Sequence, residues 1–450
     1  MKKGSLIHKL KGSYVRLIAI GFVLLIGIGT ILLSLPVATR TGHRMPFVDA
    51  LFTATSATCV TGLVVADTYT NWSLFGQLVI LSLIQIGGLG FLTIGIYIAI
   101  LFKKKIGLWG REAIHESVST MQSAGSVKMT KKIIQGTFLI EGIAAFLLAC
   151  RFIPVLGVAE GIYYGIFHAI SGFCNAGFDL MGRWEVYSSL CLFRGDVLVN
   201  VVIMALIILG GLGFVVWDDV LRNKWHWKKY LLHTKVVLSF TSVLIFGSAF
   251  LFFCLERENL FSGLPVKDTV LSSLFAAVTP RTAGFNTVDL AAMTDGSKLL
   301  TTILMFIGGS PGSTAGGVKT TTVAVMFLSA IAMIRSSYGT NVYGRRLEEE
   351  VVRKAATVFF INLSLALTAI FVILAIQPLD FMDVCMEVFS AIGTVGMSTG
   401  VTRQLNTVSK VIIILLMYCG RLGSLSFVLV FAQKRKVPPM LNPKDKMLVG

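Results

Sequence analysis

The chain has 450 residues, of which 55% are hydrophobic and 14% are charged, and its mean hydropathy is +0.79. This composition excludes an ordinary water-soluble domain and predicts an integral membrane protein. The net charge of +17 is carried by basic residues between apolar segments, so we expect a lipid membrane and no nucleic acid as a partner. The seven cysteines lack CxxC or metal-ligand spacing, which argues against a zinc site or a disulfide framework.

Long and short apolar segments follow one another in a repeated order along the chain: long, short, long. The long segments can each cross about 30 Å of hydrocarbon and lie at 14–36, 73–102, 132–154, 196–221, 234–255, 298–334, 353–376 and 407–432. The first of them is too long for a signal peptide and has no small-residue cleavage site after it, so we expect a retained membrane helix. The short segments lie at 47–59, 160–173, 266–279 and 380–393. They are too short to span a membrane and predict re-entrant half-helices that stop inside the protein.

A stretch of small residues with a central glycine follows each short segment. The four stretches are Val60-Thr61-Gly62-Leu63, Asn175-Ala176-Gly177-Phe178, Thr282-Ala283-Gly284-Phe285 and Thr394-Val395-Gly396-Met397. Their glycines recur at intervals of 115, 107 and 112 residues, which indicates a fourfold repeat.

We therefore predict an all-α integral membrane protein with a fourfold pseudo-symmetric repeat. Each repeat is a helix, a re-entrant pore helix with a filter loop, and a second helix, so that eight transmembrane spans surround one pore. The predicted repeats are 1–105, 106–222, 223–336 and 337–450, and the last includes a cytoplasmic C-terminal tail. Alternate loops are basic, at 2–16, 103–132, 222–235, 335–354 and 434–446. Because basic loops stay in the cytoplasm, both termini are expected there, with the glycine stretches facing outward.

The glycine stretches have the chemistry of a cation filter. A dehydrated cation needs oxygens in place of water, and backbone carbonyls supply them without a fixed charge. Glycine permits backbone conformations that a Cβ would penalise, and the negative end of each preceding half-helix favours a cation. Asp67, Asp179 and Asp289 follow three of the glycines and would concentrate cations at the outer mouth. A tight turn is the alternative for any single glycine, but four in register favour a filter for a monovalent cation.

The segments 56–63, 171–178, 279–286 and 393–398 resemble the filters of the Ktr/Trk/HKT superfamily of potassium transporters, most closely those of bacterial Ktr membrane subunits. The resemblance covers nearly the whole chain. It implies potassium uptake across the cell membrane, with potassium bound at Gly62, Gly177, Gly284 and Gly396 as the transported ion and no organic cofactor in this chain. It also implies a homodimer controlled by a ring of cytoplasmic nucleotide-binding regulatory subunits (KtrA-like).

The sixth long segment is interrupted by a run that cannot form a straight helix, because proline removes a hydrogen bond and glycine adds backbone freedom. The run is Gly308, Gly309, Ser310, Pro311, Gly312, Ser313, Thr314, Ala315, Gly316 and Gly317. It is either a tightly packed helix break or a loop that lies across the pore. In the family that the chain resembles, such a loop is the gate.

Arg421 lies inside the last apolar segment, where an unpaired charge costs several kcal/mol. The resemblance implies that it projects into the pore below the filter as part of the gate. The alternative is an ion pair with an acid such as Glu141 that stabilises the helix bundle. His168, on the second short segment, is interpreted as a packing residue whose hydrogen bonds are satisfied.

A sodium- or proton-coupled cation carrier is the alternative function. Such a carrier needs ionisable groups near the middle of the membrane and commonly has inverted repeats. The four predicted repeats run parallel, which favours a channel-like pore but leaves sodium coupling open. No catalytic motif or soluble catalytic domain is evident, so we do not expect an enzyme.

Overall fold

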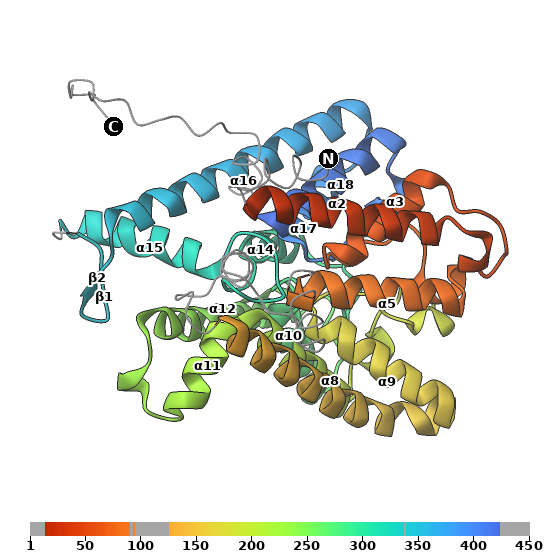
Figure 1. Cartoon of the computed structure of the whole chain (residues 1–450), viewed down its shortest axis with the longest axis horizontal. Coiled ribbons are helices and arrows are strands. Elements are labelled where there is room, and N and C mark those ends of the chain that lie inside the picture. The colour runs from red at the N-terminus through yellow and green to blue at the C-terminus, as the bar shows by residue number, and fades with distance from the viewer. Residues whose placement is uncertain (1–13, 91–92, 95–125, 337–338, 424–450) are drawn as a thin grey trace, which may run out of the picture.

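The structure is a computed structural model that describes residues 14–90, 93–94, 126–336 and 339–423 (Figure 1). Within these ranges the regular secondary structure is almost entirely helical, which confirms the all-α prediction. The strands of the described part are β1 (Asn341–Val342) and β2 (Arg345–Arg346), which pair in antiparallel fashion. The predicted N-terminal basic segment, much of the loop 103–132 and the C-terminal tail lie outside the described residues.

Among the described residues, four helices are each long and apolar enough to cross a membrane. They are α2 (Tyr14–Leu33), α8 (Ser126–Leu156), α12 (Leu232–Glu256) and α16 (Glu349–Ile376), and they match the first, third, fifth and seventh predicted long segments. Large apolar side chains such as Phe146, Phe246 and Phe371 are exposed on them. Exposed apolar faces of this kind suit contact with lipid.

The second helix of each quarter of the chain is shorter or broken. These helices are α5 (Leu74–Leu89), α10 (Val197–Leu212) with α11 (Phe214–Asn223), α14 (Asp295–Phe306) with α15 (Thr320–Ile334), and α18 (Thr407–Leu422). The interruption predicted within 298–334 is confirmed. The rest of segments 73–102 and 407–432 lies largely outside the described residues, so the count of eight spans stays a prediction.

The predicted long segment 196–221 is not one continuous helix. α10 and α11 are bent by 98° at Gly213. Gly213 has φ +96°, which favours glycine, and a Cβ on it would lie 2.6 Å from the carbonyl oxygen of Pro311. The bend therefore depends on close packing of the loop that follows α14.

Four short helices lie where the half-helices were predicted, with bounds within two residues. They are α3 (Phe47–Thr58), α9 (Val158–Phe173), α13 (Val266–Val278) and α17 (Phe381–Gly393). Each has an acidic third residue, namely Asp49, Glu160, Asp268 and Asp383, which the positive end of a helix dipole stabilises. Lys410 of α18 pairs with Asp49 at 2.6 Å, and Lys298 of α14 pairs with Asp383 at 3.4 Å.

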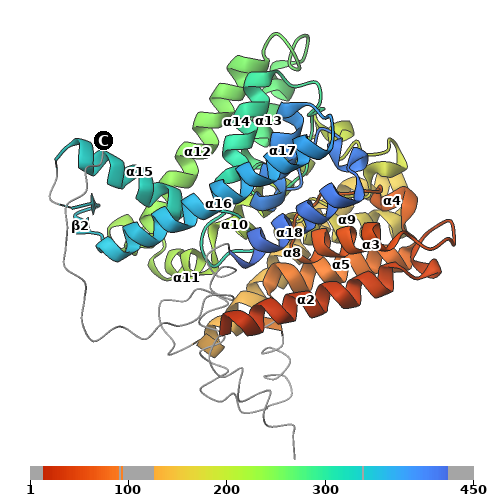
Figure 2. The same ribbon diagram turned by 90° about the horizontal axis from the view of Figure 1, so that it is seen from above.

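The first and last quarters of the chain lie side by side, with α3 packed against α18 (Figure 2). α15 and α16 extend together away from the other helices, and the hairpin of β1 and β2 joins them (Figures 1 and 2). The remaining short elements are α4 (Thr68–Asn71), η2 (Pro36–Ala38), η3 (Met181–Arg183), η4 (Cys191–Phe193), η5 (Trp227–Lys229) and η6 (Val401–Gln404). The main buried cluster includes Phe173, Phe178 and Phe285, which flank the glycine stretches.

Candidate ion pathway

The four glycine stretches meet in a closed ring, although they are more than 100 residues apart in sequence. A Cβ added to Gly62 would lie within 3.0 Å of the carbonyl oxygen of Ala176. The same relation joins Gly177 to Ala283, Gly284 to Val395, and Gly396 back to Thr61. We call the segments 60–62, 175–177, 282–284 and 394–396 together the glycine ring. Any side chain at one of these glycines would collide with a carbonyl of the next segment.

The backbone of the glycine ring has an unusual conformation in all four segments. Val60, Asn175, Thr282 and Thr394 have φ values of +58°, +60°, +69° and +53°, and the glycine two positions later also has positive φ. Positive φ is a strained conformation for β-branched residues such as valine and threonine and costs about 1–3 kcal/mol each. Such strain at Val60, Thr282 and Thr394, three of the four matching positions, points to a functional requirement, because packing alone would select glycine or asparagine there.

A hydroxyl residue near the end of each short helix supports the segment after it. The Ser56 hydroxyl accepts a hydrogen bond from the Gly62 N–H at 3.1 Å, and Ser390 does the same for Gly396 at 3.0 Å. Ser171 donates to the carbonyl oxygen of Phe178 at 2.6 Å, and Thr279 donates to that of Phe285. The short helices therefore fix the ring and direct their negative C-terminal ends toward it.

Several buried oxygens of the glycine ring have no hydrogen-bond partner among the described residues. They are Oγ1 of Thr61, Oγ1 of Thr394 and Oδ1 of Asn175. An unsatisfied buried polar atom costs about 1–3 kcal/mol. Two of them face glycines of neighbouring segments, since a Cβ on Gly210 would lie 2.6 Å from Oδ1 of Asn175 and one on Gly316 would lie 2.1 Å from Oγ1 of Thr394. The oxygens that the ring offers a dehydrated monovalent cation are therefore chiefly its backbone carbonyls, which carry no fixed charge.

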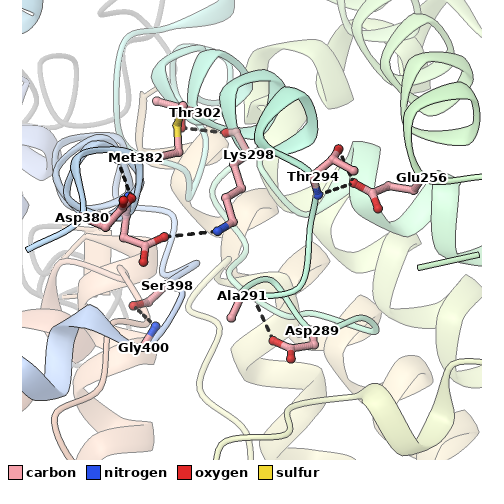
Figure 3. Close-up of polar contacts among 11 residues, drawn as sticks. Glu256, Asp289, Ala291, Thr294, Lys298, Thr302, Asp380, Met382, Ser398 and Gly400 are labelled. Carbon is pink, nitrogen blue, oxygen red and sulfur yellow. Dashed lines mark hydrogen bonds and ion pairs between the residues drawn. The ribbon is translucent and has the colours of Figure 1, made fainter. Parts of the chain in front are cut away.

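A cavity of about 150 Å³ lies on one side of the glycine ring, and we call it the mouth cavity. All four glycines of the ring line it, together with Asp67, Asp179, Asp289, Tyr187 and Arg403. Asp179 and Asp289 each accept a hydrogen bond at 2.9 Å from the N–H two residues later, as Figure 3 shows for Asp289 and Ala291. Asp67 accepts from Thr70 N–H at 2.8 Å. The three acids predicted at the outer mouth thus lie in one cavity.

The loop from Gly308 to Gly317 is held between several helices. Gly308 N–H bonds to Val318 O at 2.8 Å, which closes the loop on itself. Ser310 N–H bonds to Gly211 O at 2.9 Å, so the loop also joins the end of α10. The Thr314 hydroxyl bonds to the carbonyl oxygen of Phe173, the last residue of α9, at 3.1 Å. The loop also reaches the ring itself, since a Cβ on Gly316 would collide with the side chain of Thr394.

Arg421 ties this loop to two helices. Its guanidinium donates to the carbonyl oxygens of Thr314 and Gly87, and to that of Gly88 at 2.8 Å. It makes no ion pair among the described residues. The alternative partner Glu141 instead accepts from the Gln85 amide at 3.1 and 3.2 Å, so the ion-pair hypothesis was wrong. Arg421 therefore links the fourth quarter of the chain to the loop of the third and to α5 of the first.

Two further polar residues are placed by the structure. Lys319, two residues after the loop, donates from Nζ to the carbonyl oxygen of Ala315 at 2.7 Å, a contact that no sequence motif predicts. His168 is fully buried, with Nδ1 2.8 Å from the carbonyl oxygen of Tyr164 and Nε2 accepting from Leu180 N–H at 3.3 Å. The interpretation of His168 as a satisfied packing residue is confirmed.

A second repeated motif, which the sequence analysis missed, marks the ends of the second helices. It is a glycine pair after an apolar residue: Gly87-Gly88, Gly210-Gly211 and Gly308-Gly309, with Gly420-Arg421 in the last quarter. Gly87, Gly210 and Gly420 each pack against a carbonyl oxygen at the end of the short helix of their own quarter. Arg421 therefore stands where the other three quarters have the second glycine.

The fold and this pathway define a membrane protein of the cation-transporter class. The chain belongs to the TrkH family of cation transport proteins, whose sequence profile matches residues 10–438. This family consists of transporters, so the expectation that the chain is not an enzyme is confirmed.

Similar proteins extend over nearly the whole chain. The potassium/sodium uptake protein NtpJ of Enterococcus hirae is 41% identical over 93% of this chain and 93% of its own. The Ktr system potassium uptake protein B of Bacillus subtilis is 41% identical over 89% of both chains. The crystal structure of the potassium transporter TrkH from Vibrio parahaemolyticus has the same fold, with a TM-score of 0.71 at 18% identity over 92% of this chain and 84% of that one.

Proposed function

We propose that the protein takes up potassium through a channel-like pore whose selectivity filter is the glycine ring. The closed ring of four segments around one axis carries this proposal. The uptake of potassium by the relatives NtpJ and Ktr protein B supports potassium as the ion.

The proposed ion sites lie between the carbonyls of the glycine ring, at Gly62, Gly177, Gly284 and Gly396. Carbonyl oxygens replace the water of a potassium ion. The strained, glycine-dependent backbone keeps these oxygens directed at the ion, and the short helices add negative potential at their C-terminal ends.

The loop Gly308–Gly317 and Arg421 form the proposed gate. The loop bonds to α10, α9 and Arg421, so moving it would break hydrogen bonds at three places. A guanidinium beneath the ring repels a passing cation in a low-dielectric pore. Together they would hold the pathway closed until another part of the assembly shifts them.

We further propose the arrangement expected from sequence: four repeats at 1–105, 106–222, 223–336 and 337–450, eight spans, and both termini in the cytoplasm. The mouth cavity then faces outward. A homodimer and a ring of nucleotide-binding regulatory subunits complete the proposed assembly; two relatives are named as lettered proteins, B and D, of a Ktr system.

The proposal is tested with purified protein in proteoliposomes, by comparing fluxes of potassium, rubidium, sodium and lithium. Potassium and rubidium should pass much faster than sodium and lithium, each down its own gradient. Equal fluxes of the four ions would remove the assignment of potassium. Potassium accumulation driven by a sodium or proton gradient alone would instead favour the coupled carrier.

A further inference from the structure

Arg403 and Tyr187 form a cation–π contact, with the guanidinium carbon 4.1 Å from the centre of the tyrosine ring. Arg403 follows the glycine of the fourth segment, and Tyr187 follows that of the second. Around the glycine ring these two segments are opposite, since Gly177 adjoins the first and third segments. Both residues line the mouth cavity. The contact therefore crosses the mouth of the pathway.

Both ends of this contact are held in place. Tyr187 has φ +65°, and its N–H donates to Oδ2 of Asp67 at 3.3 Å, which ties it to the first quarter of the chain. The guanidinium of Arg403 lies against Gly400, where a Cβ would be 2.5 Å from Nη2. Gly400 in turn donates to the Ser398 hydroxyl at 3.0 Å (Figure 3). Arg403 is exposed, and its guanidinium lies at the cavity wall between the Tyr187 ring and Gly400.

The charges of the mouth cavity are unequal among the four quarters. The first three contribute Asp67, Asp179 and Asp289, and the fourth contributes Arg403. Several carboxylates around one cavity suit divalent cations, which prefer charged oxygen ligands. A divalent ion held there would block the route to the glycine ring.

We propose that Arg403, held across the mouth cavity by Tyr187, is a specificity-determining residue that keeps divalent cations out of it. This inference rests on the proposed function of the glycine ring. The physical basis is that the local concentration of an ion depends exponentially on its charge times the potential. If the guanidinium lowers local monovalent occupancy by some factor, it lowers divalent occupancy by about the square of that factor.

The test measures rubidium uptake into proteoliposomes at low ionic strength while external Ca²⁺ is titrated. For Arg403→Gln we expect Ca²⁺ to inhibit rubidium uptake by half at a concentration about tenfold lower than in the unmodified protein, or lower still. The gain in apparent rubidium affinity should be smaller than this change. Arg403→Lys keeps the charge and should resemble the unmodified protein. Tyr187→Leu keeps the charge of Arg403 but removes the aromatic ring that holds it. The Ca²⁺ sensitivity of this variant should lie between those of the unmodified protein and Arg403→Gln.

Unchanged Ca²⁺ inhibition in folded Arg403→Gln would overturn the proposal. Equal sensitivity of the Lys and Gln variants would also overturn it, because packing and not charge would then be responsible. Calorimetric titration of Ca²⁺ into the detergent-solubilised proteins measures the same effect without transport. Tighter Ca²⁺ binding by the Gln variant would support the role of Arg403 even if the glycine ring proved not to select potassium.

Discussion

Nη2 of Arg421 donates a hydrogen bond to the carbonyl oxygen of Gly88 at 2.8 Å, and the two residues hold the same position in two copies of one motif. In two of the other copies the second glycine is tightly packed, since a Cβ on Gly88 would lie 2.7 Å from Sγ of Cys174 and one on Gly309 would lie 2.3 Å from Cβ of Ala315. In the last copy this position holds an arginine whose guanidinium reaches the loop and α5. One substitution within a repeated motif thus provides both a charge and a link between Thr314 and α5.

Replacing Arg421 should open the pathway. We expect Arg421→Ala to increase potassium flux, because the variant loses a positive charge that repels the ion and the hydrogen bond to the Thr314 carbonyl. The carbonyls it leaves unpaired should cost about 1–3 kcal/mol of stability. Flux in proteoliposomes and the melting temperature are measured on the same sample. Arg421→Lys keeps the charge but cannot reach all three carbonyls. Its potassium flux should lie between those of the unmodified protein and Arg421→Ala. Slower flux through folded Arg421→Ala would contradict the gate.

Shortening the loop provides a separate test of the gate. Deletion of Pro311–Ser313 removes the contact of Gly312 O with Phe214 N–H but leaves Thr314 and Gly316 in place. We expect higher flux and weaker dependence on any cytoplasmic regulator, since the loop would be less firmly held. The matched control is Ser336→Ala, outside the loop. If the deletion variant is folded and its flux is at or below the normal level, the loop is a structural helix break only.

Uptake should depend on pH through Asp179. Burial raises the pKa of this carboxyl from 3.8 to about 7, and the charge of Asp67 adds to the rise while the Met181 N–H opposes it. As the pH falls through about 7, the mouth cavity loses a negative charge, so the apparent potassium affinity should fall. The raised pKa also means that the free energy of unfolding decreases as the pH rises toward 7. In this range the unfolded chain has already released the proton, while the folded chain still holds it.

The pH effect is checked by measuring uptake kinetics between about pH 6 and 8, the range that spans this pKa. Asp179→Asn should give low affinity at every pH and a flatter profile. A profile as steep as that of the unmodified protein would show that another group is responsible.

The glycine ring should tolerate a side chain poorly. In Gly62→Ser the new Cβ meets the carbonyl oxygen of Ala176 and must adopt φ +92°, so it displaces a filter oxygen of the second segment. We expect sodium to compete better with potassium for uptake and the stability to drop by about 1–2 kcal/mol. Gly42→Ser, at φ +70° with no atom within 4 Å, controls for backbone strain alone. Equal selectivity in both variants would make Gly62 only a turn residue.

Local signals allowed the short helices to be predicted from the sequence. Pro46 and Pro265 immediately precede α3 and α13, and small-residue stretches end all four helices. The bend at Gly213 could not be predicted, because it depends on the carbonyl of Pro311 in a distant segment. The partners of Arg421 were also missed, since backbone carbonyls leave no signature in a sequence. The repeated glycine pair was visible and would have marked the position of Arg421.

The contact between Arg403 and Tyr187 was beyond sequence reasoning for a related reason. It joins two loops more than 200 residues apart, and its meaning depends on the order of the segments around the glycine ring. The sequence alone placed acids after three glycines, but only the folded chain brings them together with the guanidinium in one cavity.

The most direct measurement of the central proposal is the anomalous scattering of rubidium or thallium in crystals of the purified protein. The ions should lie on the axis of the glycine ring, between the carbonyl oxygens of Thr61, Ala176, Ala283 and Val395. Crystals grown in sodium should lack this density. Ions bound elsewhere in the protein, with none on the axis of the glycine ring, would contradict the proposal.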